Sequence, residues 1–235
     1  MLAVYKREMK AYFSSPIAYI YLAVFCLITG YVFCLGNLMS ATTSFSSVFS
    51  VVFTVMMVLL PLLTMRLFAD EKKQKTDQGL LTAPVSLSGI VCGKFFAALS
   101  VFALGMLVYI CYAAVLNVLA GSIPFAEFVG NMCGLLLLGG SFISIGIFVS
   151  SLTELQIVAA IGTFIINLLL YICDLIASNM QWEPVKAVLN AIGFYSRYTE
   201  FTQGILNVTS VLYFLSVIFV FNFLTVRVLE RRRWS

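Results

Sequence analysis

One short pattern in the sequence resembles a phosphate-binding loop, Gly89-Ile-Val-Cys-Gly93-Lys94. In such a loop the glycines let backbone N–H groups surround the phosphates, the lysine contacts them, and a following Ser or Thr binds magnesium. Here the glycines are one residue too close and Phe95 stands at the magnesium position. No strand and helix of a parallel sheet are expected around the pattern, so we do not expect this chain to bind a nucleotide.

Other residues capable of chemistry are equally sparse. The chain has no histidine, which excludes histidine general bases and histidine metal ligands. None of the six cysteines forms a pair with metal-ligand spacing, and cysteines in membrane spans behave as small hydrophobic residues. No nucleophile elbow or pair of catalytic carboxylates is present either. We therefore expect no catalytic residue, no metal and no cofactor in this chain.

The composition indicates a membrane protein. Hydrophobic residues make up 62% of the chain and charged residues only 10%, against about 25% charged in a soluble domain. A helical span needs roughly 20 apolar residues. Runs of this kind occur near 17–36, 48–65, 95–117, 132–150, 155–176 and 208–226. The sequence therefore predicts an all-α protein of six transmembrane helices, with residues 1–235 forming a single domain.

Two further segments are expected to lie at the membrane surface. Residues 1–16 read as a short interfacial helix, and residues 177–207 as an external segment of short helices at or in the opposite interface. The apolar face of the first helix is made by Leu2, Tyr5, Met9, Tyr12 and Phe13.

The basic residues predict the orientation. Twelve of the 14 Lys and Arg residues fall in the N-terminal segment, in residues 66–94 or in the C-terminal tail, and only Lys186 and Arg197 fall on the other side of a six-span arrangement. Cytoplasmic segments carry the excess of Lys and Arg. Both termini are therefore expected in the cytoplasm, in a multi-pass protein of the cytoplasmic (inner) membrane. The net charge of +4 reports topology and does not indicate nucleic-acid binding.

Residues 66–94 interrupt the apolar sequence between spans two and three. This segment holds eight of the 24 charged residues. It includes Glu71, followed by Thr76-Asp-Gln-Gly-Leu-Leu-Thr-Ala-Pro-Val-Ser86, and ends in Gly93-Lys94. Taken alone, the segment is a solvated connector held on the cytoplasmic side by its positive charge.

The same segment resembles the first cytoplasmic loop of type-2 ABC permeases. Further similarity lies in Tyr5-Lys-Arg-Glu8 with Tyr12-Phe-Ser-Ser-Pro16, in Ser144–Thr153 followed by Gln156–Ala160, and in Leu224–Trp234. The similarity extends over nearly the whole chain, and it is closest to the gliding-motility type of permease. Two residues depart from the family pattern: Lys75 replaces a usual Gly, and Gly79 replaces a usual Leu.

The resemblance implies that this loop forms a coupling helix bound in a cleft of a separate ABC ATPase subunit, which carries the ATP and Mg²⁺. It implies coupling roles for Glu71, Thr76, Asp77, Leu80, Leu81, Pro84 and Val85. It also implies a second copy of the chain or a homologous permease beside it, with an accessory membrane protein as a further possible partner. The chain would then export a substrate that the sequence does not identify.

Span five carries a polar stripe. At about 100° per residue, one face collects Gln156, Thr163, Asn167, Tyr171 and Asp174. Such groups are unfavourable against lipid, so this face should meet protein or a water-filled cavity. The stripe is a candidate substrate path or subunit interface, although Asp174 is close enough to the outer end to reach water. In span four, Gly130 and Gly134 allow close helix packing within the chain or with a second copy.

Two other classes of function stay open at this stage. The chain could be a membrane scaffold that transports nothing and transmits ATPase-driven mechanical work to extracytoplasmic partners. A secondary transporter should show internal repeats and charges within its spans, and here Asp174 is the candidate for such a charge.

Overall fold

The computed structural model describes residues 1–40, 42–75, 86–120, 125–179, 182, 186, 189, 192–205 and 207–234, and every secondary-structure element within these ranges is helical. In chain order the elements are α1 (Leu2–Ser14), α2 (Pro16–Phe33), the π-helix η1 (Cys34–Leu38), α3 (Ser46–Thr64), α4 (Arg66–Lys73), α6 (Leu87–Met106), α7 (Val108–Ala120), α8 (Phe125–Leu152), α9 (Gln156–Asn179), α11 (Tyr195–Thr202) and α12 (Val208–Trp234).

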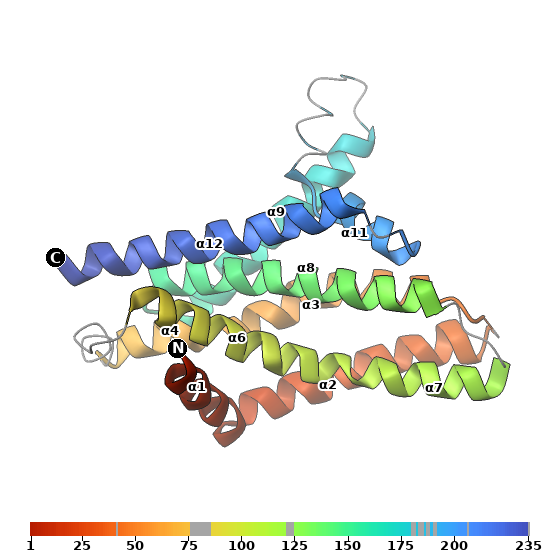
Figure 1. The fold of residues 1–235 in the computed structure, drawn as a ribbon, viewed down its shortest axis with the longest axis horizontal. Helices are drawn as coiled ribbons and strands as arrows, with labels where there is room; N and C mark the ends of the chain where they lie inside the picture. Colours follow the sequence, from red (N-terminus) through yellow and green to blue (C-terminus); the bar gives the residue numbers. More distant parts are fainter. Residues whose placement is uncertain are drawn as a thin grey trace.

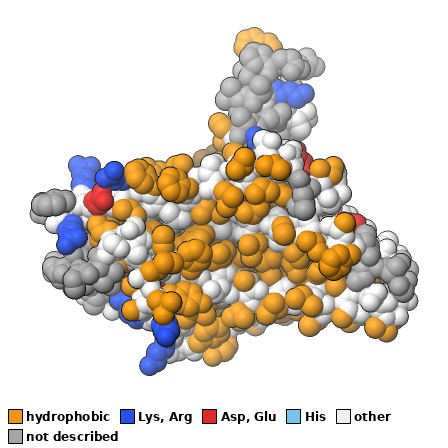
Figure 2. Space-filling model, in the orientation of Figure 1, with side chains coloured by type: hydrophobic (Ala, Val, Ile, Leu, Met, Phe, Trp, Pro, Cys, Tyr) orange, Lys and Arg blue, Asp and Glu red, His pale blue; other side chains and the backbone are white. Residues whose placement is uncertain are grey.

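Six helical stretches of the described chain are long and apolar enough to cross a membrane, which confirms the predicted all-α fold with six spans. They are Pro16–Leu38, Val48–Lys73, Leu87–Leu119, Phe125–Leu152, Gln156–Ser178 and Val208–Arg233. Hydrophobic side chains cover most of the visible side of the bundle (Figure 2). The second and third of these stretches extend further into the charged segment 66–94 than the apolar runs predict, and Lys72 and Lys94 within them are buried.

The first two helices meet at a corner. Ser15 has extended backbone angles (φ −113°, ψ 155°), as expected for a residue that precedes proline. Pro16 then begins α2, where its missing N–H is not needed. As a result, the short helix α1 runs across the end of the bundle, while α2 runs along it (Figure 1).

Helix α8 is the centre of the bundle and packs against α3, α6, α9, α11 and α12. Glycines on α8 permit this contact. A Cβ added at Gly134 would lie 2.5 Å from the Cβ of Phe201 on α11, and one at Gly139 would overlap the ring of Phe102 on α6. The glycine pattern in this span therefore serves packing within the chain.

Both termini lie at the same end of the bundle, together with α1 and α4 (Figure 1). Lys and Arg side chains gather at this end in the space-filling view (Figure 2). We call it the basic end. The predicted coupling segment lies in the chain between α4 and α6.

Candidate functional site

A fully buried lysine occupies the middle of the basic end. Lys94, in the second turn of α6, has no exposed surface. Its Nζ donates hydrogen bonds to Glu8 Oε1 (3.0 Å) and to the carbonyl oxygen of Leu67 (2.6 Å), and it lies 3.0 Å from Glu71 Oε1. The same atom is 4.8 Å from the centre of the Phe68 ring. A buried ammonium needs this combination of opposite charge and hydrogen bonds to be tolerated.

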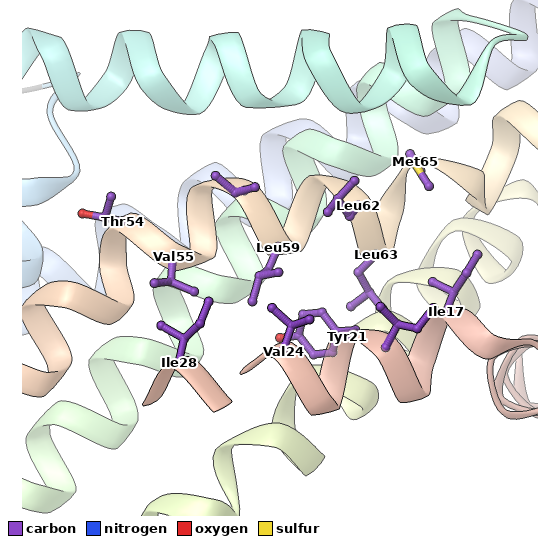
Figure 3. Close-up of a pocket in the computed structure, with 12 residues that line it drawn as sticks. Ile17, Tyr21, Val24, Ile28, Thr54, Val55, Leu59, Leu62, Leu63 and Met65 are labelled. Carbon is purple, nitrogen blue, oxygen red and sulfur yellow. The ribbon is translucent and has the colours of Figure 1, made fainter. Parts of the chain in front are cut away.

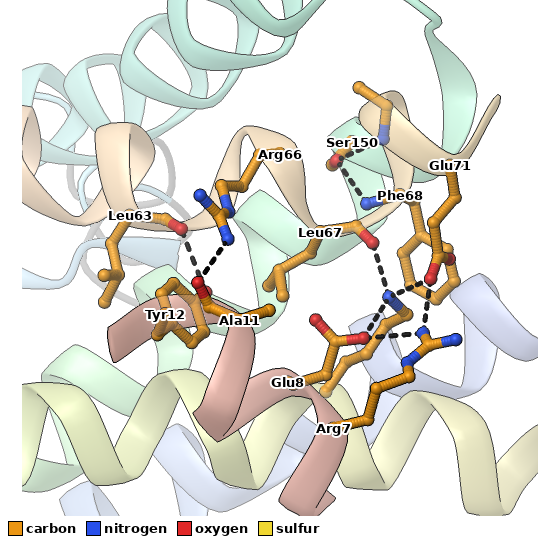
Figure 4. A network of polar contacts seen from close by, with 12 residues as sticks. Arg7, Glu8, Ala11, Tyr12, Leu63, Arg66, Leu67, Phe68, Glu71 and Ser150 are labelled. Atoms are coloured by element: carbon orange, nitrogen blue, oxygen red, sulfur yellow. Dashed lines mark hydrogen bonds and ion pairs between the residues drawn. The ribbon is translucent and has the colours of Figure 1, made fainter. Parts of the chain in front are cut away.

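Arg7 connects the same two acids from the other side. Its Nη2 donates to Glu8 Oε1 at 2.7 Å and also to Glu71 Oε1. Arg7, Glu8, Glu71 and Lys94 thus form a group of two cations and two anions, which we call the ion cluster (Figure 4). The charges balance, and they come from α1, α4 and α6.

The surroundings of Glu8 favour its charged form. Burial is the largest single influence on its pKa and acts to raise it, but the charges of Lys94 and Arg7, with their hydrogen bonds, together outweigh burial. The pKa of Glu8 is therefore lowered below its ordinary value. Glu8 thus carries a negative charge near neutral pH, and the charge keeps α1 bound to α6.

Two glycines let α1 approach α6 closely enough for these contacts. A Cβ added at Gly93 would lie 3.0 Å from the Cβ of Val4 and 3.1 Å from the carbonyl oxygen of Met1. A Cβ at Gly89 would lie 3.5 Å from the backbone nitrogen of Met1. The Gly89–Lys94 pattern that resembles a phosphate-binding loop thus has another role, since its glycines receive α1 and its lysine binds Glu8.

Helix α4 is fixed to the end of α8 by a serine. Ser150 Oγ accepts hydrogen bonds from the backbone N–H groups of Phe68 and Ala69, both at 3.1 Å, and donates to the carbonyl oxygen of Met65 at 2.9 Å. The first N–H groups of a helix have no partner within the helix. Ser150 supplies that partner from a different helix, and Lys72 Nζ adds a hydrogen bond to the carbonyl oxygen of Leu152 (3.1 Å).

A second set of contacts joins α4 to α1. Arg66 donates from Nη1 to Ser15 Oγ (2.8 Å) and from Nη2 to the carbonyl oxygen of Ala11 (3.1 Å), and its guanidinium lies over the ring of Tyr12. Tyr12 itself donates to the carbonyl oxygen of Leu63 (3.0 Å). The short helix α4 is therefore held by polar contacts to α1, α6 and α8 together (Figure 4).

The predicted coupling residues divide into two groups. Glu71 lies in the ion cluster. Thr76, Asp77, Leu80, Leu81, Pro84 and Val85 lie outside the described residues, as does Gly79, so their roles stay predictions. Lys75, just after α4, has a left-handed backbone (φ 55°). Glycine adopts this conformation without strain, which explains why a glycine would suit this position.

The predicted stripe on α9 lies largely inside the chain, because α9 packs against α3 and α8. Gln156 donates to Asp70 of α4, and Tyr171 packs edge-on against Tyr195. Thr163, Asn167 and Asp174 are buried, and both polar side-chain atoms of Asn167 lack a hydrogen-bond partner among the described residues. A role in a substrate path or subunit interface stays a prediction.

Asp174 has a defined partner at the far end of the bundle. Its carboxylate accepts hydrogen bonds from the backbone N–H of Tyr195 and from the hydroxyl of Ser196, both at 2.7 Å. It therefore caps the N-terminus of α11. A side chain at Gly193 would overlap this carboxylate, so the close approach requires glycine there.

Sequence reasoning did not identify Arg7, Glu8, Lys94 or Ser150 as site residues. One signal was available for Lys94, because a lone charged residue at the start of an apolar helix requires a partner. Its partners lie 86 and 23 positions away in the sequence, at Glu8 and Glu71. No local pattern joins positions so far apart.

Comparison with known proteins adds one finding. A family model described as an ABC-2 family transporter protein matches residues 7–174, a range that contains the whole ion cluster. A search of curated proteins found no significant match.

Proposed function

The chain belongs to the ABC-2 family of transporter proteins, and from this premise we propose that it is a permease subunit that couples ATP hydrolysis by a separate ATPase to substrate export. ATP and Mg²⁺ would be bound by that ATPase, and the chain itself would perform no hydrolysis. A second copy of the chain or a homologous permease would complete the membrane unit.

The observation that carries the proposal is the position of the ion cluster. Residues 76–85, where the sequence predicts contact with the ATPase, are flanked by α4 and α6. Glu71 of α4 and Lys94 of α6 are in contact with each other and with Arg7 and Glu8 of α1. A displacement of this segment would therefore reach α1 through charged contacts and α8 through Ser150. Coupled movement of rigid helices is a common way to switch between two states.

The proposed orientation in the membrane rests on the basic residues. The excess of Lys and Arg at the basic end supports a cytoplasmic location for it, with both termini inside the cell. The proposed ATPase would then bind at the basic end. The quoted motifs favour the gliding-motility type of permease, and an accessory membrane protein is a further proposed partner.

The decisive experiment uses the full chain, co-expressed with its proposed ABC ATPase partner. Leu80→Asp with Leu81→Asp should abolish co-purification of the ATPase, because charge would replace the predicted apolar contact. Lys94→Met should leave the ATPase bound, but the rate of ATP hydrolysis should then differ less between samples with and without the permease. Lys73→Met is the matched control, since Lys73 is exposed on α4.

Three results would count against the proposal or change it. Retention of the ATPase by the double aspartate variant would remove the coupling role of residues 76–85. If ATP hydrolysis depends on the permease to the same extent in the Lys94→Met and Lys73→Met variants, the ion cluster has no role in coupling. Stimulated hydrolysis in proteoliposomes without movement of any substrate would favour the scaffold function instead.

A further inference from the structure

A groove on the side of the bundle is separate from the ion cluster. It lies between α2 and α3 and has a volume of about 630 Å³. Apart from Tyr21 and Thr54, its lining side chains are aliphatic or, in Met65, a thioether. Ile17 and Met65 lie at the end nearer α1, and Ile28 and Thr54 at the other end (Figure 3).

The length of the groove matches one leaflet of a bilayer. Its lining extends from residue 17 to residue 28 on α2, and from residue 54 on α3 to Met65, which directly follows α3; each is a rise of 11 residues. At 1.5 Å per residue this is about 16 Å. Half of a hydrocarbon core of roughly 30 Å is about 15 Å. The groove therefore begins at the basic end and has about the length of one leaflet's hydrocarbon region.

The groove opens toward the lipid. Ile20, Val58 and Leu62 line it and are also exposed, with 58%, 49% and 44% of their surface accessible. A groove of this shape, apolar along its length and open at the side, is suited to an acyl chain. It offers few polar groups to a soluble or strongly polar cargo.

A cation without an acidic partner lies beside the end of the groove. Arg66 directly follows Met65 and is partly buried. Among the described residues no carboxylate forms an ion pair with it, in contrast to the balanced ion cluster. A guanidinium has five N–H donors. Arg66 uses Nη1 for Ser15 and Nη2 for Ala11, so donors remain for a phosphate.

The basic end carries further positive charge. Lys6 and Lys10 are exposed on α1, one turn apart. Basic residues near a membrane surface attract anionic lipids by about 1 kcal/mol each. The charge of Arg66 beside the groove is thus opposite to that of a phosphate, and the interior of the groove matches a hydrocarbon chain.

We propose that the α2–α3 groove binds one acyl chain of an anionic phospholipid from the leaflet at the basic end, with the lipid phosphate bound by Arg66. The lipid would be a resident component of the bilayer and not the exported substrate. The site is independent of the proposed function, because it requires only the groove and the adjacent cation.

Lipid binding to the purified, delipidated full chain tests this site. Native mass spectrometry would compare phosphatidylglycerol with phosphatidylcholine of the same acyl chains. Both lipids carry a phosphate, but the choline ammonium of phosphatidylcholine offsets its charge beside Arg66. The wild type should therefore bind phosphatidylglycerol about tenfold more tightly, which corresponds to about 1.4 kcal/mol. Arg66→Gln should lower phosphatidylglycerol affinity to the phosphatidylcholine level, and Arg66→Lys should retain part of the preference.

Two further variants separate the lipid site from other roles of Arg66. Val58→Trp, which fills the groove, should weaken binding of both lipids. Ser15→Ala removes a contact of Arg66 within the chain but leaves the cation, so the preference for phosphatidylglycerol should persist. Wild-type preference in Arg66→Gln, or wild-type binding of both lipids in Val58→Trp, would overturn the proposal. Cross-linking of a Val58→Cys variant through position 58 to a second copy of the chain would also overturn it, because the groove would then be covered by protein.

Discussion

Replacing Lys94 with methionine is the most direct test of the ion cluster. Methionine has nearly the same length but no charge, so packing against Phe68 is largely kept. The variant would leave Glu8 and Glu71 sharing Arg7 as their cation within the cluster, and the side chain of Arg7 is 49% exposed. Removal of one member of a buried ion pair costs about 3–5 kcal/mol. Since Arg7 still compensates part of the negative charge, we expect a loss near the lower limit, about 3 kcal/mol.

A double-mutant cycle with Glu8→Gln isolates the contact itself. The double variant keeps one cation and one acid, Arg7 and Glu71, and so restores neutrality. Its destabilisation should be smaller than the sum of the two single changes, by about 1–3 kcal/mol. The assay is reversible denaturation of the full chain in detergent micelles, with Lys73→Met as an exposed control expected within about 0.5 kcal/mol of wild type. If the two single effects add to within about 0.5 kcal/mol, Lys94 and Glu8 are not energetically coupled and the reasoning fails.

Three other predictions follow from single contacts. The pKa of Glu8 is lowered on folding, so its contribution to stability is complete above its ordinary pKa of 4.5 and is lost as the pH falls through the lowered value. In this acidic range, Glu8→Gln should flatten the dependence of the free energy of unfolding on pH. An unchanged dependence would contradict the assignment. Ser150→Ala should cost about 1–2 kcal/mol and speed hydrogen exchange at the backbone of Phe68 and Ala69, whereas unchanged exchange would show that Ser150 does not cap α4. Asp174→Ala should cost about 1 kcal/mol and raise hydrogen exchange in α11 alone, and a change confined to α9 would refute the capping role.

The spans could be predicted from the sequence because apolar length is a local property. The buried face of α1 could be predicted only in part. Of the predicted face, Tyr12 is buried and Tyr5, Met9 and Phe13 pack against the core, but Leu2 is exposed. The structure also buries Val4 and Glu8, which the apolar spacing does not include. A charged acid is buried only where opposite charge or hydrogen bonds compensate it, and for Glu8 the buried cation is Lys94, 86 positions away. Hydrophobic periodicity carries no information about such a partner.

The polar stripe on α9 likewise shows what sequence periodicity cannot predict. Its polar side chains were expected to avoid lipid, and the structure buries Thr163, Asn167 and Asp174. What each contacts depends on segments that pack against α9. Asp174 binds the start of α11, 21 positions later, and Gln156 binds Asp70, 86 positions earlier. Sequence alone indicated that partners were needed but not which residues they would be.

The chemical nature of the ion cluster leads to a final prediction. Buried ion pairs can often be replaced by hydrophobic residues without loss of stability. The triple variant Lys94→Met, Glu8→Leu and Glu71→Leu removes both acids together with the buried cation and leaves Arg7, which is already half exposed. It should therefore recover most of the stability lost in Lys94→Met. Directional contacts nevertheless define how α1, α4 and α6 are positioned, and apolar contacts would allow them to slide. If the cluster serves coupling, the triple variant should be stable, yet ATP hydrolysis by the partner ATPase should respond less to its presence than to that of the wild-type chain. A triple variant that is stable and fully coupled would mean that the cluster only holds the helices together, and the coupling role would then have to be sought in residues 76–85 alone.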